Sequence, residues 1–124
     1  MDAVETATAG VARLYKLGEV PPSPEYPYGA YSAVLGRGDS RTLDGAEGMR
    51  WGRIVIQTFG RTADAAIAKA EDARDALVGT RLAVTGYETT PVGGELDPSV
   101  VRDPADTGVV SVTQTLTFTA TKEA

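Results

Sequence analysis

The stretch VSVTQTLTFTAT, residues 110–121, decides the fold of this chain. Ser or Thr occupies every odd position, and the even positions hold apolar side chains, which are Val110, Val112, Leu116, Phe118 and Ala120. Only Gln114 interrupts the apolar set. A period of two predicts a β-strand with one face on the core and one face toward water, which is typical of an antiparallel sheet.

Four earlier segments predict further strands. Residues 28–35 (YGAYSAVL) and 50–59 (RWGRIVIQTF) are rich in aromatic and β-branched side chains, and the second predicts a central strand. Residues 11–16 and 81–87 predict shorter strands. Glycine, aspartate, serine and arginine dominate residues 36–48, which predicts a long solvated hairpin loop. We expect residues 88–107 to be loop with one short edge strand.

The remaining segment between the strands predicts one main helix over residues 63–78. Thr62 precedes it as an N-cap, Asp64 suits the helix dipole, and Gly79 follows as a left-handed C-terminal cap. The apolar stripe is Ala63, Ala66, Ile67, Ala70, Ala73 and Leu77, and we expect Lys69 and the acids on the other faces. The predicted fold class is therefore α+β, an antiparallel-rich sheet with one main helix (about 62–78) packed on one face.

Length and composition favour one globular domain over residues 1–124. The chain has 42% hydrophobic and 23% charged residues, a mixture that supports a packed core. Neither a signal peptide nor a membrane-spanning run is recognisable, so we expect a protein that is cytosolic when made. The net charge of −5 does not favour binding to the phosphates of nucleic acid, although it does not exclude the passage of DNA.

The chain contains no His and no Cys, which removes the commonest general bases, thiol nucleophiles and zinc ligands. Carboxylates remain. Asp72 and Asp75 are three residues apart on the helix, while Asp97, Asp103 and Asp106 lie in one loop. Asp72 and Asp75 could together hold a hard cation, but a solvated helix face is the favoured interpretation. The loop aspartates could resemble a calcium site, but their spacing does not match an EF-hand loop. We expect no catalytic residue, no metal site and no cofactor.

Two other patterns have a functional and a structural interpretation. Tyr26, Tyr28, Tyr31 and Trp51 could form a stacking platform for bases or sugars, but core or interface positions are favoured by the acidic net charge. The tripeptide at 37–39 reads Arg-Gly-Asp, which we interpret as chance in a flexible loop.

The order of the parts resembles the tail-terminator, or tail-completion, family of long-tailed (siphovirus-type) bacteriophages. The resemblance covers nearly the whole chain from about Val11 onward. The stretches that carry it are Val20-Pro21, Tyr26-Pro27-Tyr28, the strand at 52–59, the Ala-rich helix, residues 76–82 (ALVGTRL), and Arg102-Asp103-Pro104 with the alternating strand. Members of the family usually begin with a longer helix, whereas residues 1–10 offer at most a short one.

The resemblance implies a virion structural protein rather than an enzyme. It implies a homo-oligomeric ring, typically hexameric, that caps the tail tube, stops its polymerisation and joins the tail to the head-completion (stopper) protein. The implied partners are the tail tube protein and the stopper, with DNA passing through the lumen without specific binding and no membrane partner. The implied location is the head–tail junction at the top of the tail, after assembly in the bacterial host cytoplasm.

A closed ring needs two complementary patches on each subunit. We expect the charged residues of the two long loops to contact neighbouring subunits or partners; they are Arg37, Asp39, Arg41, Asp44, Glu47, Glu95, Asp97, Arg102 and Asp103. Two alternatives stay open. One is a head-completion stopper or adaptor at the same junction, and the other is a small metal- or ligand-binding domain.

Overall fold

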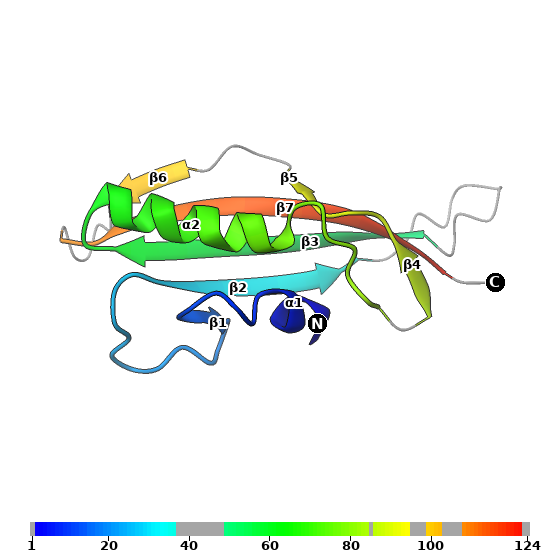
Figure 1. The fold of residues 1–124 in the computed structure, drawn as a ribbon, viewed down its shortest axis with the longest axis horizontal. Coiled ribbons are helices and arrows are strands. Elements are labelled where there is room, and N and C mark those ends of the chain that lie inside the picture. The colour runs from blue at the N-terminus through cyan, green and yellow to red at the C-terminus, as the bar shows by residue number, and fades with distance from the viewer. Residues whose placement is uncertain (1, 37–48, 85, 95–98, 103–107, 123–124) are drawn as a thin grey trace.

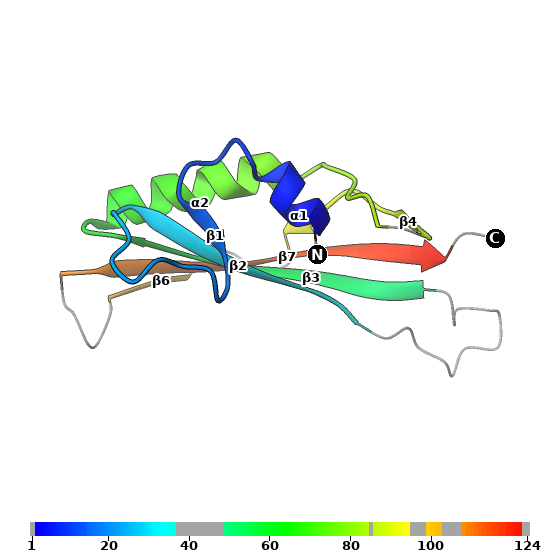
Figure 2. The same ribbon diagram turned by 90° about the horizontal axis from the view of Figure 1, so that it is seen from below.

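The protein folds into one mixed sheet with a helix packed on one face, as the computed structural model shows (Figures 1 and 2). The structure describes residues 2–36, 49–84, 86–94, 99–102 and 108–122. The elements in chain order are α1 (Asp2–Ala7), β1 (Leu14–Lys16), β2 (Tyr28–Leu35), β3 (Met49–Gly60), α2 (Ala63–Leu77), β4 (Tyr87–Thr89), β5 (Gly93–Gly94), β6 (Ser99–Arg102) and β7 (Val110–Lys122). The predicted α+β class, with its main helix on one face, is confirmed.

The strand order in the sheet is β1-β2-β3-β7-β4, and β5 and β6 also pair with β7. Only the β1–β2 pair is parallel among the strand pairs that the structure describes. The long strands β3 and β7 pair along their whole length, from Met49 opposite Thr121 to Gly60 opposite Val110. These two strands therefore form the centre of the sheet. β2 adds to the outer edge of β3, with β1 beyond it, and the outer edge of β7 carries β4, β5 and β6 (Figure 1).

The alternating segment forms β7 as predicted. Its apolar positions are buried, with Leu116 and Ala120 fully inaccessible and Phe118 only 3% exposed, while the threonines between them are half-buried. The strands predicted at 28–35 and 50–59 are also confirmed, as β2 and β3. The main core lies between the sheet and the helices, and its largest fully buried apolar members are Ile54, Ile56, Leu77 and Leu116.

The predicted helix forms as α2, and Thr62 caps it by accepting a hydrogen bond from the Ala65 amide at 3.1 Å. At the other end, the amide of Thr80 donates to the Leu77 carbonyl (3.0 Å) while Val78 is extended and Gly79 has φ +84°. This geometry is a type II turn, whose third position requires the positive φ that glycine tolerates. Gly79 thus has the predicted conformation, but its amide bonds the carbonyl of Val92 instead of a helix carbonyl.

Two buried polar side chains fix how α2 sits on the sheet. The hydroxyl of Thr58 on β3 donates to the Ala66 carbonyl (2.9 Å), and the amide nitrogen of Gln114 on β7 donates to the Ala70 carbonyl (2.8 Å). The two carbonyls lie one helical turn apart on the sheet side of α2. Gln114, which interrupts the apolar pattern of β7, therefore has a structural role at the helix–sheet contact.

The strand predicted at 81–87 is wrong over residues 81–84 and at Gly86, the described positions of that segment that lie outside β4. Single bridges join Arg81 to Pro91 and Val84 to Tyr87, and β4 begins only at Tyr87. Proline has no amide to extend a ladder, and Gly86 turns the chain with φ +84°. The hydroxyl of Thr89 instead donates to the Leu82 carbonyl, which holds this segment by a side-chain bond (2.7 Å).

Three further predictions need correction. Residues 88–107 contain β5, β6 and most of β4 instead of one edge strand, because the outer edge of β7 is long enough to pair with several short segments. The strand predicted at 11–16 begins only at Leu14, since Arg13 has a positive φ of 54° that breaks extended structure. Finally, Ala63 is exposed, and Lys69, expected on a wet face, is only 5% exposed.

The N-terminal segment forms the short helix that the sequence predicts. The helix α1 spans six residues, and Val4 is fully buried in the main core. The hydroxyl of Thr8 donates to the Val4 carbonyl at 2.8 Å, which closes the helix end. Both helices lie on the same side of the sheet, and the opposite side carries no described helix (Figure 2).

Candidate assembly surface

The sheet side that faces away from α2 is the most distinctive surface of the described chain. Because side chains alternate along a strand, the cross-strand register places one set of residues on this side. We call these residues the open face: Tyr28, Ala30, Ser32 and Val34 of β2; Trp51, Arg53, Val55, Gln57 and Phe59 of β3; Thr113, Thr115, Thr117 and Thr119 of β7. Within this set, Arg53 is the only side chain that is charged near neutral pH.

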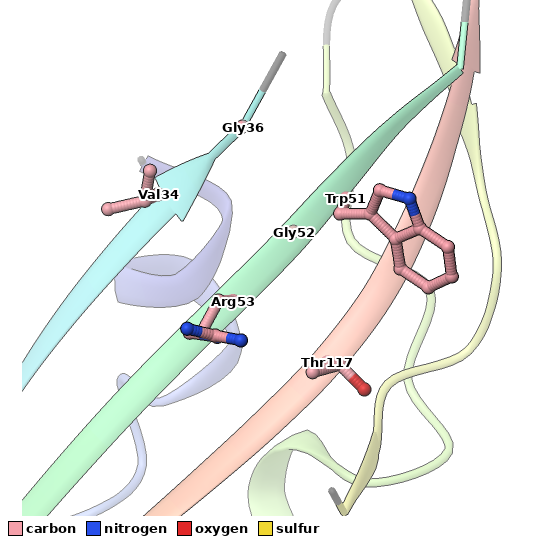
Figure 3. Close-up of a pocket in the computed structure, with 6 residues that line it drawn as sticks. All are labelled: Val34, Gly36, Trp51, Gly52, Arg53 and Thr117. Carbon is pink, nitrogen blue, oxygen red and sulfur yellow. The ribbon is translucent and has the colours of Figure 1, made fainter. Parts of the chain in front are cut away.

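One end of the open face has two large exposed apolar side chains. Val34 is 61% exposed and Trp51 is 58% exposed. They line a depression of about 710 Å³ together with Gly36, Gly52, Arg53 and Thr117. Figure 3 shows the indole of Trp51 leaning over β7 and the guanidinium of Arg53 on the side toward β2. Exposed aromatic and aliphatic groups beside an arginine are the composition of contact points in protein interfaces.

The glycine in this depression is required by the opposite side of the sheet. Gly52 pairs with Phe118 of β7, and the Phe118 ring lies directly over the Gly52 Cα on the core side. A side chain at Gly52 would overlap that ring. The glycine therefore lets an aromatic residue seal the core underneath the exposed Trp51.

The other end of the open face holds a half-buried aromatic cluster. Tyr28 stacks on Phe59 with ring centroids 4.9 Å apart, Tyr26 lies 5.3 Å from Tyr28, and the guanidinium of Arg61 lies 4.3 Å above the Tyr26 ring. The suggested stacking platform is therefore not one cluster. Tyr31 is 3% exposed in the main core, and Trp51 lies at the opposite end of the sheet.

Four described carboxylates lie elsewhere, on the solvent side of α2. Asp64, Glu71, Asp72 and Asp75 are all exposed there. The described residues contain no group of three or more His, Cys, Asp or Glu side chains that could hold a metal ion. Asp97, Asp103 and Asp106, the other carboxylates considered, lie outside the described residues, as does the Arg-Gly-Asp tripeptide at 37–39.

The loop residues expected to contact neighbours also fall almost entirely outside the described part of the chain. These are Arg37, Asp39, Arg41, Asp44, Glu47, Glu95, Asp97 and Asp103. The backbone of Arg102 belongs to β6, at the outer edge of the sheet. Their interface role stays a prediction. Val34 was not predicted as a contact residue, whereas Trp51 was expected at a core or interface position. The alternation in residues 50–59 already separates Trp51 from the core-facing Ile54 and Ile56.

Lys69 on α2 is a titratable group with a perturbed pKa. Burial lowers its pKa below 10.5, the neighbouring Arg13 lowers it further, and Asp72 opposes both. The stem of Lys69 is buried on the flank of α2, away from the open face. It bears on stability and gives no sign of a catalytic group.

No helix in the described ranges is both long and apolar enough to cross a lipid bilayer. The chain matches no protein-family model and no curated protein sequence.

Solved structures do share its fold. A chain in the virion of a native gene transfer agent (GTA) particle superposes with a TM-score of 0.68 at 19% identity, over 93% of this chain and 84% of that chain. A second solved protein superposes with a TM-score of 0.58 at 12% identity, over 99% of this chain and 96% of that one. At these identities, the likeness establishes a common fold that extends over nearly the whole chain.

Proposed function

We propose that this chain is a structural protein of a virion and forms the tail-terminator ring of a long-tailed bacteriophage. The observation that carries the proposal is the superposition on the gene transfer agent virion chain, which spans 93% of the residues. The composition agrees, because a chain without His or Cys has few means of catalysis. The open face agrees as well, since exposed Trp51 and Val34 need a protein partner to cover them.

In this role the protein binds the end of the tail tube and offers no equivalent surface to the next ring of tube subunits. Polymerisation therefore stops where the terminator binds, and its far side receives the head-completion protein. We expect a homo-oligomeric ring, with six copies as the family resemblance suggests, at the head–tail junction. DNA passes through it without specific contacts, which suits a chain of net charge −5 because each bound phosphate would slow transit.

Deletion of the gene in a phage-producing strain tests this function. A missing terminator leaves tube growth unchecked, so electron micrographs of lysates should show tails of variable, excessive length that are not attached to heads. Complementation with the intact gene should restore uniform length. Tails of normal length in the deletion strain would refute the proposal.

Cross-linking separates this role from a head-completion stopper or adaptor. The terminator should cross-link to the tail tube protein, whereas an adaptor should cross-link to the portal ring and leave tail length unchanged on deletion. The third possibility, a metal- or ligand-binding domain, predicts heat on titration with divalent cations that is lost in Asp72→Ala.

A further inference from the structure

The outer edge of β2 is only half covered. The strand β1 pairs with Gly29, Ala30 and Tyr31. The last bond to β2 runs from the amide of Leu17 to the Tyr31 carbonyl (2.7 Å), and the chain then turns away at Gly18, with φ +94°. The second half of β2 continues beyond that point, and no strand in the described residues pairs with it on this side.

The backbone groups on this free half can be assigned from the hydrogen bonds. The amide of Gly36 donates to the Trp51 carbonyl, so Gly36 and alternate residues before it direct their amide and carbonyl groups toward β3. Ala33 and Leu35 therefore direct theirs outward, as Gly29 and Tyr31 do toward β1. No described residue bonds the outward amide and carbonyl groups of Ala33 and Leu35. Figure 2 shows α1 raised onto the α2 side of the sheet, out of line with the strands.

The far edge of the same sheet offers a complementary strand. Alternate residues of β7 direct their backbone groups outward, as the bond from the Thr90 amide to the Thr119 carbonyl shows. By this alternation, Ser99 and Val101 of β6 bond β7, and Val100 and Arg102 face away from it. Within the described chain, β6 pairs with β7 alone.

We propose that the free edge of β2 at Ala33 and Leu35 pairs with the outer edge of β6, at Val100 and Arg102, in a second copy of this chain. The inference rests on the proposed ring and names the contact that builds it. β2 runs parallel to β7, and β6 runs antiparallel to β7, so a sheet that continues from copy to copy brings these edges together antiparallel. The two surfaces differ, as a ring closed by rotation requires.

The relative height of the two edges also fits a closed assembly. Val100 pairs with Val112, Val112 pairs with Thr58, and Thr58 pairs with Gly29. Val100 and Gly29 therefore lie at the same height along the strand direction. Pairing Val100 with Leu35 of the next copy shifts each copy along the strands by about six residues, or about 20 Å at ~3.3 Å per residue. A sheet that closes on itself needs such a stagger. The added strand would also cover the exposed Val34.

Ala33→Pro tests the pairing because it removes an outward amide that has no partner among the described residues of its own chain. Proline is tolerated at edge positions of this kind, so the monomer should keep its circular dichroism spectrum. Ala33→Ser, which keeps the amide, is the matched control. In sedimentation equilibrium of the purified full chain, Ala33→Pro should weaken self-association at least about tenfold. The substitution removes the amide donor at position 33, and the proline ring would collide with the incoming strand. Ala33→Ser should associate like the unmodified protein.

Amide hydrogen exchange of the unmodified protein tests the same pairing without relying on a variant. The amides of Ala33 and Leu35 should exchange fast in dilute protein and become protected as association proceeds, together with Val100 and Arg102. Persistently fast exchange in the associated protein, or a protein that stays monomeric at every concentration, would overturn the inference. The tail-length assay remains a separate test, so normal rings from Ala33→Pro would refute this contact and leave the terminator role standing.

Discussion

The close approach of Phe118 to Gly52 leads to a sharp prediction about stability. In Gly52→Ala the new methyl carbon would overlap the Cε1 and Cζ atoms of Phe118 and lie 2.6 Å from Cε2. The ring is 3% exposed and packed in the main core, so it cannot rotate away into a void. The substitution therefore forces the ring outward or pushes β3 and β7 apart.

The expected loss of stability follows from three contributions. Overpacking a filled core costs about 1–3 kcal/mol. Uncovering about a quarter of a buried aromatic surface of ~200 Å² adds about 1 kcal/mol at ~25 cal/mol per Å². Alanine also lowers the backbone entropy of the unfolded chain relative to glycine, which offsets about 0.5–1 kcal/mol of this loss. We expect a net loss of about 2–3 kcal/mol in the free energy of unfolding, or about 10 °C in Tm for a domain of this size.

Urea unfolding followed by tryptophan fluorescence measures this loss directly, because Trp51 neighbours the site. Gly93→Ala is the matched control: Gly93 is in a strand, has ordinary φ and has nothing within 4 Å of an added Cβ. It should change stability by less than about 0.5 kcal/mol. Adding Phe118→Leu to Gly52→Ala should recover part of the loss. If Gly52→Ala is as stable as Gly93→Ala, the ring does not lie over Gly52 and the account of this contact fails.

Three further outcomes are expected. Thr58→Val should cost about 0.5–1.5 kcal/mol in urea unfolding, because the bond to Ala66 is lost while the side-chain volume is kept; an unchanged midpoint would remove the proposed role in placing α2. Since Lys69 has a lowered pKa in the fold, the folded state holds its proton less tightly than the unfolded chain, so stability should rise with pH up to about 10.5. Lys69→Met should flatten that rise, and equal slopes would contradict the assignment. Trp51→Ser should leave the Tm nearly unchanged but impair tail completion in phage complementation, and full activity would show that Trp51 stays uncovered.

The parts of the fold with a strong local period were predictable from the sequence. The alternation in residues 110–121 specifies both the strand β7 and its buried face, and Thr62 marks the start of α2 through its side-chain cap. The predicted strands at 28–35 and 50–59 match β2 and β3, because β-branched and aromatic residues are concentrated there.

The remaining features depend on contacts between segments that are distant in sequence, and no local sequence pattern reports such contacts. The short strands β5 and β6 exist because β7 offers a long edge, and two glycines at 93–94 give no strand signal by themselves. The burial of Lys69 likewise depends on segments that are distant in sequence. The sequence predicts part of the open face, since alternation separates Trp51 from Ile54. Only the fold shows that neither described helix covers this face.

The central claim, that this chain forms a ring at the top of a phage tail, is tested most directly by electron cryo-microscopy of intact virions from the producing phage. The account predicts one ring of this chain between the last ring of tail tube and the head-completion protein. Density for this fold at another position in the particle, or its complete absence from the particle, would contradict it.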